Sequence, residues 1–215
     1  MKCNIVHLIT LALVIRNLLS TRPSDRTTVV KYTAVHKSVG KLQYLETYWR
    51  GEICYVDTIN GLCVKEKAVS KLKDRFGQVD QLEITHAAIY KIPLIERMSD
   101  YGFLYHAYVV FRTSGSHNGS WWSVEKTIRS LIMQRGDRKE DVTDFRDGDK
   151  RWVAAAPSVV VEDNCKMSMV DFFDFLHDSE EVNHNYHGVN ANCQHFAARV
   201  FNELATSISA AIGIS

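Results

Sequence analysis

NANCQHFAARVFNEL, residues 190–204, is the stretch from which the fold and the chemistry are best inferred. From Phe196 to Ala205 the apolar residues recur at helical spacing, which predicts an amphipathic helix with one buried face. Asn192 is among the most favourable N-cap residues, so we expect Cys193 in the first helical turn. There the unpaired N–H groups and the helix dipole favour an anion such as a thiolate. Cys193 is therefore either an activated nucleophile or, as free cysteines often are, a small buried hydrophobe.

Composition places the chain among ordinary globular proteins. Its 215 residues suffice for one domain with an extension or for two small domains, and 46% are hydrophobic. Lys and Arg number 26 against 25 Asp and Glu, and this balance gives no reason to expect nucleic acid as a partner. The most charged stretch, residues 135–151, carries both signs in equal number, so we expect a solvated connection there.

The N-terminal residues 1–21 form an apolar leader or an N-terminal helix. The run from Ile5 to Ile15 has the length of a signal-peptide core and is too short to span a membrane as a helix. A glycosylation sequon at Asn118 is compatible with secretion. Secretion through a leader and a cytoplasmic or membrane-peripheral location both remain open.

The remaining chain divides into a mixed α/β N-terminal extension, residues 22–80, and a main domain, residues 81–215. In the extension, Asn60-Gly61 predicts a tight hairpin that sets Cys63 opposite Thr58. Cys54 would then lie about 13 Å away along the strand, so we expect no disulfide between the two cysteines.

In the main domain, strands precede a closing helix, which predicts an α+β fold. Aromatic and β-branched residues predict strands at 82–92, 103–113 and 120–128, and a further strand within 152–163. The strands at 103–113 and 120–128 are expected to form a hairpin. A short helix from Ser168 is expected before the Cys193 helix.

A nucleophilic cysteine needs a base, and the chain has nine histidines. His195 is excluded by geometry, because two residues along a helix correspond to a rotation of about 200°. His184 and His187, with Cys193 and His195, form the one candidate metal cluster. Its spacing matches no standard zinc pattern. A small zinc-binding domain is therefore the least favoured alternative, and we expect no metal and no cofactor.

His106 and His86 differ from the other histidines because each begins an apolar strand. His106 shares a strand face with Tyr108 and Val110. A histidine at a strand start that faces a helix N-terminus can form a thiolate–imidazolium pair, as in papain-like enzymes. The commoner role of a single strand histidine is structural.

NCQHFA resembles the Asn-Cys motif of the lecithin:retinol acyltransferase-like group, in which NCEHF opens the catalytic helix. That group belongs with the circularly permuted papain-like enzymes of the NlpC type, which place the histidine strand before the cysteine helix. His106 followed by Cys193 has this order. The resemblance covers residues 84–205 approximately and is specific at NCQHF and at a strand-initial histidine. It implies a permuted papain-like fold, with an antiparallel sheet and Cys193 at the start of a C-terminal helix.

Two interpretations of the other site residues remain open. The acyltransferases carry H-x-G/A-I-Y and a second histidine within about a dozen residues; here HAAIY begins at His86, and His106 follows twenty positions later. Either His86 is the base and His106 orients it, or His106 is the base and Glu125 orients it. We favour the second, because a hairpin brings Glu125 near His106 and Pro93 interrupts the first strand. The predicted catalytic residues are therefore Cys193, His106 and Glu125.

The chemistry that the resemblance implies is acyl transfer through an acyl-cysteine intermediate. The protein would then be a thiol-dependent acyltransferase or hydrolase that acts on lipid acyl esters or on amide or isopeptide bonds. The expected partner is a lipid or peptide-like acyl substrate, with no nucleic acid. Membrane-surface association and oligomeric state stay open. The main alternative is a non-catalytic binding module on the same scaffold.

Overall fold

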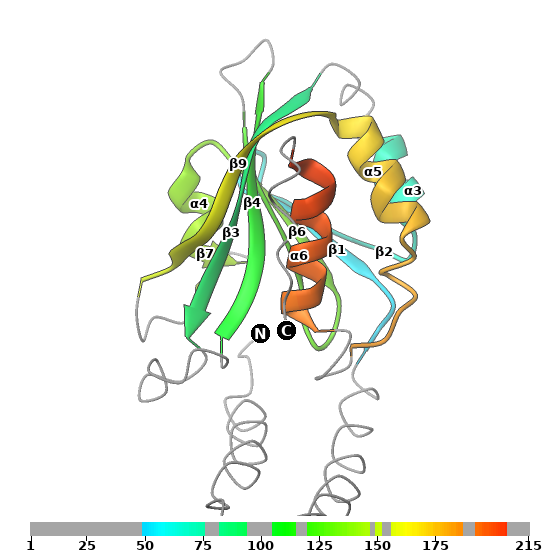
Figure 1. Cartoon of the computed structure of the whole chain (residues 1–215). Coiled ribbons are helices and arrows are strands. Elements are labelled where there is room, and N and C mark those ends of the chain that lie inside the picture. Colours follow the sequence, from blue (N-terminus) through cyan, green and yellow to red (C-terminus); the bar gives the residue numbers. More distant parts are fainter. Residues whose placement is uncertain are drawn as a thin grey trace, which may run out of the picture.

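The computed structural model describes residues 49–75, 82–93, 105–114, 120–146, 149–151, 156–186 and 192–205 (Figure 1). The predicted leader at 1–21, the sequon at Asn118 and His187 lie outside these residues, so the predictions about them stay predictions. Within the described ranges, no helix combines the length and the apolar character needed to cross a membrane.

One seven-stranded sheet, in the order β2-β1-β6-β5-β4-β3-β9, organises the structure. The strands are β1 (Ile53–Asp57), β2 (Leu62–Glu66), β3 (Glu83–Pro93), β4 (Tyr105–Ser114), β5 (Trp121–Lys126), β6 (Leu131–Gly136) and β9 (Ser158–Ser168). Neighbouring strands are antiparallel except β1 and β6, which are parallel. The sheet is therefore mixed, and the prediction of an antiparallel sheet is wrong at this pair. Because β1 and β6 are far apart along the chain, no local pattern shows that they pair.

Strands β1 and β2 come from the predicted N-terminal extension, and they extend the same sheet as the strands of the predicted main domain. Their hairpin has a longer loop than Asn60-Gly61 predicts. Cys63 lies opposite Val56 and not Thr58. The reason is Asp57, whose carboxylate accepts hydrogen bonds from the backbone N–H groups of Ile59 and Asn60 and so opens the turn to four residues. Cys54 and Cys63 are not joined by a disulfide, in agreement with the prediction.

Helices cover both faces of the sheet. On one face lie α3 (Val69–Arg75), α5 (Met169–Asp178) and α6 (Cys193–Leu204), and on the other lies the short α4 (Lys139–Thr143). A two-stranded sheet, β7 (Phe145–Arg146) and β8 (Asp149–Lys150), follows α4. The predicted α+β class is confirmed, and the last described helix contains Cys193.

The main core lies between the sheet and α3, α5 and α6. Phe172 of α5 contacts Phe111 of β4 edge-on, with ring centroids 5.0 Å apart. The apolar stripe predicted for α6 is buried in this core, with Phe196, Val200 and Phe201 at most 1% exposed. Full burial of such a side chain contributes about 1.5–3 kcal/mol. Through this core α6 packs against β4, and the first turn of the helix lies near the start of that strand.

The charged stretch 135–151 is not merely the solvated connection that we expected. It contains α4, whose Val142 is fully buried against the second face of the sheet, and it ends at Arg151, which is only 4% exposed. The prediction is wrong there because composition counts charges without showing which of them are paired inside the fold.

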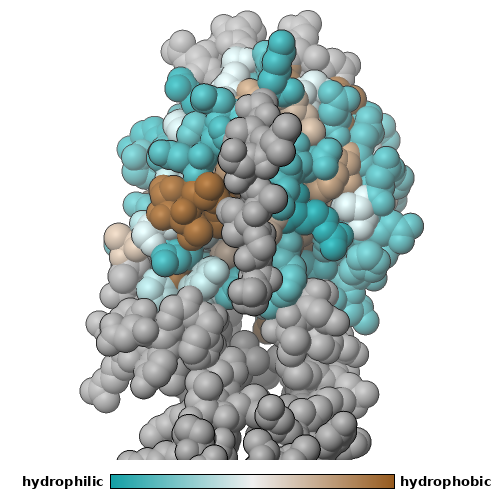
Figure 2. Space-filling model, in the orientation of Figure 1, coloured by the Kyte–Doolittle hydropathy of each residue, from teal (hydrophilic) through white to brown (hydrophobic). Residues whose placement is uncertain are grey.

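An apolar patch interrupts the surface along the edge strand β9. Val159 and Val160 are 42% and 45% exposed, and Figure 2 shows a hydrophobic patch on the side of the molecule where β9 lies. Strand β9 is an edge of the sheet, since only β3 pairs along its length. The bridge from Cys165 to Ala205 covers the other end of this edge.

The close approach of α4 to β6 gives a prediction about stability. A Cβ on Gly136 would lie 2.6 Å from Cβ of Asp141, closer than two carbon atoms can pack. Gly136→Ala should therefore lower the free energy of unfolding by about 1–3 kcal/mol in urea titrations. Gly61→Asn is the matched control, because that site has open space and a left-handed backbone that Asn tolerates; it should cost less than about 1 kcal/mol. Equal effects would contradict the tight packing of α4 on β6.

Candidate active site

Cys193 is the first residue of α6, and Asn192 caps the helix as predicted. The Asn192 side-chain oxygen accepts hydrogen bonds from the backbone N–H of Gln194 at 2.9 Å and of His195 at 3.1 Å. Cys193 itself is 5% exposed. Its thiol therefore lies in the positive field of the helix N-terminus and is largely shielded from water, which strengthens that field.

A side-chain hydrogen bond joins the start of α6 to the start of β4. The side-chain amide of Gln194 donates a hydrogen bond to the backbone oxygen of Tyr105 at 3.2 Å. Cys193 consequently lies beside His106, the second residue of β4, and the two side chains are hydrogen-bonded. The structure thus brings together the cysteine and the histidine that the sequence analysis favoured.

Glu125 of β5 lies on the other side of the His106 ring. Nε2 of His106 is 2.5 Å from Oε2 of Glu125, and the antiparallel register that pairs Val109 with Val124 brings the two residues together. His106 is 15% exposed in its side chain, whereas Glu125 has no exposed side-chain surface. Because Nε2 is engaged by Glu125, Nδ1 is the ring nitrogen that remains for the thiol of Cys193.

Two arginines hold the Glu125 carboxylate. Nη1 of Arg151 lies 2.7 Å from Oε1, and Nη1 of Arg146 lies 3.5 Å from Oε2. Burial raises the pKa of Glu125, but both arginines and His106 outweigh burial and hold that pKa well below its usual range. Glu125 is therefore a carboxylate at any physiological pH.

Arg151 is fixed by further contacts on the same face of the sheet. Its Nη2 donates to Oγ of Ser123 at 3.3 Å and to the backbone oxygen of Val142 at 3.2 Å. Its guanidinium lies over the ring of Tyr108, 4.1 Å from the centroid. The ring of His106 stacks on the same tyrosine, at 6.2 Å and an interplanar angle of 15°. The ring of Tyr108 thus packs against both the Arg151 guanidinium and the His106 imidazole.

The charge state of the Cys193–His106 pair follows from these neighbours. Burial raises the pKa of the Cys193 thiol, but the His106 imidazolium and its hydrogen bond outweigh burial, and the net pKa is lowered. Burial lowers the pKa of His106, whereas the Cys193 thiolate and Glu125 raise it, to about 9. Both shifts favour a thiolate–imidazolium pair at neutral pH, which is the reactive form of a cysteine nucleophile.

Tyr186, which the sequence analysis did not single out, also contacts the thiol. Its hydroxyl donates to Sγ of Cys193 at 3.9 Å, and its side chain is buried, at 8% exposure. Burial and the nearby thiolate raise the pKa of Tyr186, so the phenol stays a neutral donor. The only sequence signal was a hydroxyl-bearing aromatic residue seven positions before Cys193. Arg151 had no such signal, because it ends a stretch that composition classified as solvated.

The other candidate histidines lie elsewhere. Nε2 of His86 is 3.5 Å from Oε2 of Glu162 on β9, and its side chain is 30% exposed. His195 contacts the cap, with Nδ1 2.9 Å from Oδ1 of Asn192, and does not face the thiol, as helix geometry predicted. The arrangement matches the interpretation in which His106 is next to Cys193 and Glu125 is next to His106.

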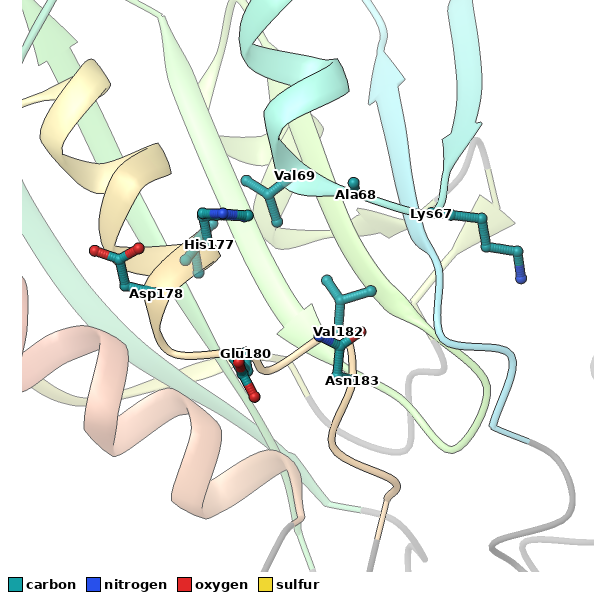
Figure 3. Close-up of a pocket in the computed structure, with 9 residues that line it drawn as sticks. Lys67, Ala68, Val69, His177, Asp178, Glu180, Val182 and Asn183 are labelled. Atoms are coloured by element: carbon teal, nitrogen blue, oxygen red, sulfur yellow. The ribbon is translucent and has the colours of Figure 1, made fainter.

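Within the part of the chain that the structure describes, no group of three or more His, Cys, Asp or Glu side chains is arranged to hold a metal ion. A pocket of about 440 Å³ lies where α3 begins and α5 ends (Figure 3). Lys67, His177, Glu180 and Asn183 line it with polar atoms. It does not include Cys193, so it is separate from the candidate active site.

Comparison with known proteins gives no match to a family model, to a curated protein or to a solved structure. The geometry of the site and the resemblance at NCQHF are therefore the observations that bear on function.

The two histidines can be distinguished by the pH dependence of Cys193 alkylation. Only the thiolate reacts, so the rate rises as the pH passes the thiol pKa, which in the wild type lies below its ordinary value. His106→Ala removes the imidazolium and should move this midpoint upward, toward about 8.5. His86→Ala is the matched control and should leave the midpoint unchanged. A shift with His86→Ala and none with His106→Ala would contradict the assignment.

Proposed function

We propose that the protein is a cysteine-dependent acyltransferase or hydrolase that forms an acyl-cysteine intermediate on a permuted papain-like fold. The observation that supports this most is the hydrogen-bonded series of Cys193, His106 and Glu125 at the N-terminus of α6. The chain order, with the histidine strand before the cysteine helix, agrees with the resemblance to the lecithin:retinol acyltransferase-like group.

In the first half-reaction, Sγ of the Cys193 thiolate attacks the substrate carbonyl carbon. The C=O π electrons move to oxygen, and a tetrahedral oxyanion forms. Asn192 already caps the N–H groups of Gln194 and His195, so the N–H of Cys193 is the first-turn donor best placed to receive this oxyanion. When the intermediate collapses, the bond to the leaving alcohol or amine breaks, and His106 gives that group its proton. The product of this half-reaction is a thioester on Cys193.

In the second half-reaction, His106 is neutral and acts as a base. It takes the proton of an incoming water, alcohol or amine as that nucleophile attacks the thioester carbonyl. Collapse of the second tetrahedral intermediate releases the acylated product and restores both the Cys193 thiolate and the His106 imidazolium. Water as acceptor makes the protein a hydrolase, and any other acceptor makes it a transferase. Glu125 stays ionised throughout and orients the imidazole through Nε2.

The substrate classes that suit this chemistry are lipid acyl esters and amide or isopeptide bonds. A thiolate forms the same thioester from each class, and only the leaving group differs. An amine leaves poorly unless it is protonated, so amide substrates depend more strongly on the proton held by His106. The ratio of ester to amide turnover should therefore rise in a His106 variant, because loss of the proton slows amide turnover more than ester turnover.

An activated ester such as p-nitrophenyl acetate tests the proposal without a known substrate. Wild-type protein should release p-nitrophenol in a burst of about one equivalent, and peptide mass spectrometry should find the acetyl group on Cys193. Cys193→Ala should lose the burst with a melting temperature near that of the wild type, because the side chain remains small and apolar. Cys165→Ala, which removes another buried thiol, is the control and should keep the burst. Acetylation spread over several cysteines, or none at Cys193, would contradict the proposal and favour a non-catalytic binding module.

A further inference from the structure

Arg151 is a buried cation that ordinary stability arguments do not explain. It is 4% exposed, and its backbone N–H donates to the backbone oxygen of Asp144 at 2.6 Å. Its Nε is buried without a hydrogen-bond partner among the described residues. Removing an arginine and a glutamate from water costs about as much as their attraction returns, and a packed apolar pair often serves stability equally well. The Arg151–Glu125 pair therefore calls for an explanation in terms of what it does to the site.

The charges around Glu125 alternate in sign along one line of contacts. Cys193 is the thiolate, His106 the imidazolium, Glu125 the carboxylate and Arg151 the guanidinium. Each charge is flanked by opposite charges, which is the arrangement that a low-dielectric interior tolerates best. Without Arg151, Glu125 would be a fully buried carboxylate beside a proton donor. It would then tend to take the proton of His106 and leave a neutral pair.

We propose that Arg151 is a positioning residue of the active site, which keeps Glu125 an oriented carboxylate and thereby keeps the proton on His106 that Cys193 requires. This inference rests on the proposed function, because a positioning residue needs a reactive pair to position. The planar guanidinium of Arg151 suits this role. Its Nη1 donates a hydrogen bond to Glu125, and its Nη2 donates to Ser123 and to the backbone oxygen of Val142.

The remaining titratable and charged groups around the site do not replace Arg151. Arg146 is nearer the surface, with 35% of its side chain exposed, and it approaches Glu125 only at 3.5 Å. Tyr108 lies beside Arg151, and Tyr105 and Tyr186 lie near Cys193; burial raises the pKa of all three, so they stay neutral. Of the two arginines that contact Glu125, Arg151 is therefore the buried one and the nearer one.

The test is the pH midpoint of Cys193 alkylation by iodoacetamide, measured on the full chain by peptide mapping. Arg151→Gln removes the cation, and it should move the midpoint upward by about one pH unit or more, because His106 no longer retains its proton. Arg199→Gln is the matched control: it removes an arginine from a more exposed ion pair with Glu181, on α6 itself, and should leave the midpoint unchanged. A purely structural role for Arg151 would lower stability and leave the midpoint of the folded protein where it was.

A double-variant cycle shows whether Arg151 acts through Glu125. Glu125→Gln alone should raise the midpoint, since the imidazolium loses its carboxylate. Adding Arg151→Gln to Glu125→Gln should then shift the midpoint by less than half of the shift that Arg151→Gln causes alone. Full additivity of the two shifts would overturn the proposal, because it would show that Arg151 acts independently of Glu125.

Arg151→Lys keeps the charge and provides a second variant should Arg151→Gln not fold. A lysine ammonium can contact Glu125 but cannot reproduce the fork that also holds Ser123 and Val142, so we expect a midpoint between those of the wild type and His106→Ala. A wild-type midpoint in both Arg151 variants overturns the role of Arg151 and leaves the proposed function intact. A wild-type midpoint already near 8.5 would contradict the proposed function as well.

Discussion

The carboxylate of Glu125 has no exposed surface, yet it is held as an anion by His106 at one oxygen and Arg151 at the other. The rest of the site depends on this one buried charge. An ionised Glu125 raises the pKa of His106, and a charged His106 lowers the pKa of Cys193. Desolvation opposes the charged form of each of the three groups. Their mutual attraction outweighs it, together with the attraction of Arg151 and Arg146 for Glu125.

The fold meets this constraint by bringing four separate segments to one end of the sheet. Strand β4 carries His106, β5 carries Glu125, the chain after β8 carries Arg151, and the first turn of α6 carries Cys193. The apolar faces of β4 and α6 pack into the main core, which fixes the strand and the helix relative to each other. The rigid scaffold is therefore the reason that a hydrogen bond between Cys193 and His106 needs no rearrangement.

Much of the geometry could be predicted from local patterns. The N-cap Asn192, the buried stripe of α6 and the β4–β5 hairpin all leave signals in short, continuous stretches of sequence, and the structure has each of them. The hairpin expected between residues 103–113 and 120–128 also predicts that Glu125 lies near His106. These features follow from backbone hydrogen bonding and from the periods of helix and strand.

What could not be predicted depends on contacts between distant residues. The parallel pairing of β1 with β6 joins residues 78 positions apart, as Ile53 and Leu131 are, and no local period reveals it. The sequence does not predict the burial of Arg151, because the residue lies in a charged stretch typical of exposed loops. Its partner Glu125 lies on a separate strand. Tyr186 was missed because the approach of its hydroxyl to Cys193 depends on how the chain before α6 folds back.

Titration of the His106 imidazole by NMR is the decisive experiment, because it measures the charge state of the residue between the thiol and the carboxylate. We expect His106 in the wild type to stay protonated until the pH approaches about 9. In Cys193→Ser the thiolate is absent, so the same resonance should titrate at a lower pH. A wild-type His106 that titrates near 6.5, unaffected by Cys193→Ser, would contradict the buried chain of alternating charges and the nucleophilic role of Cys193 with it.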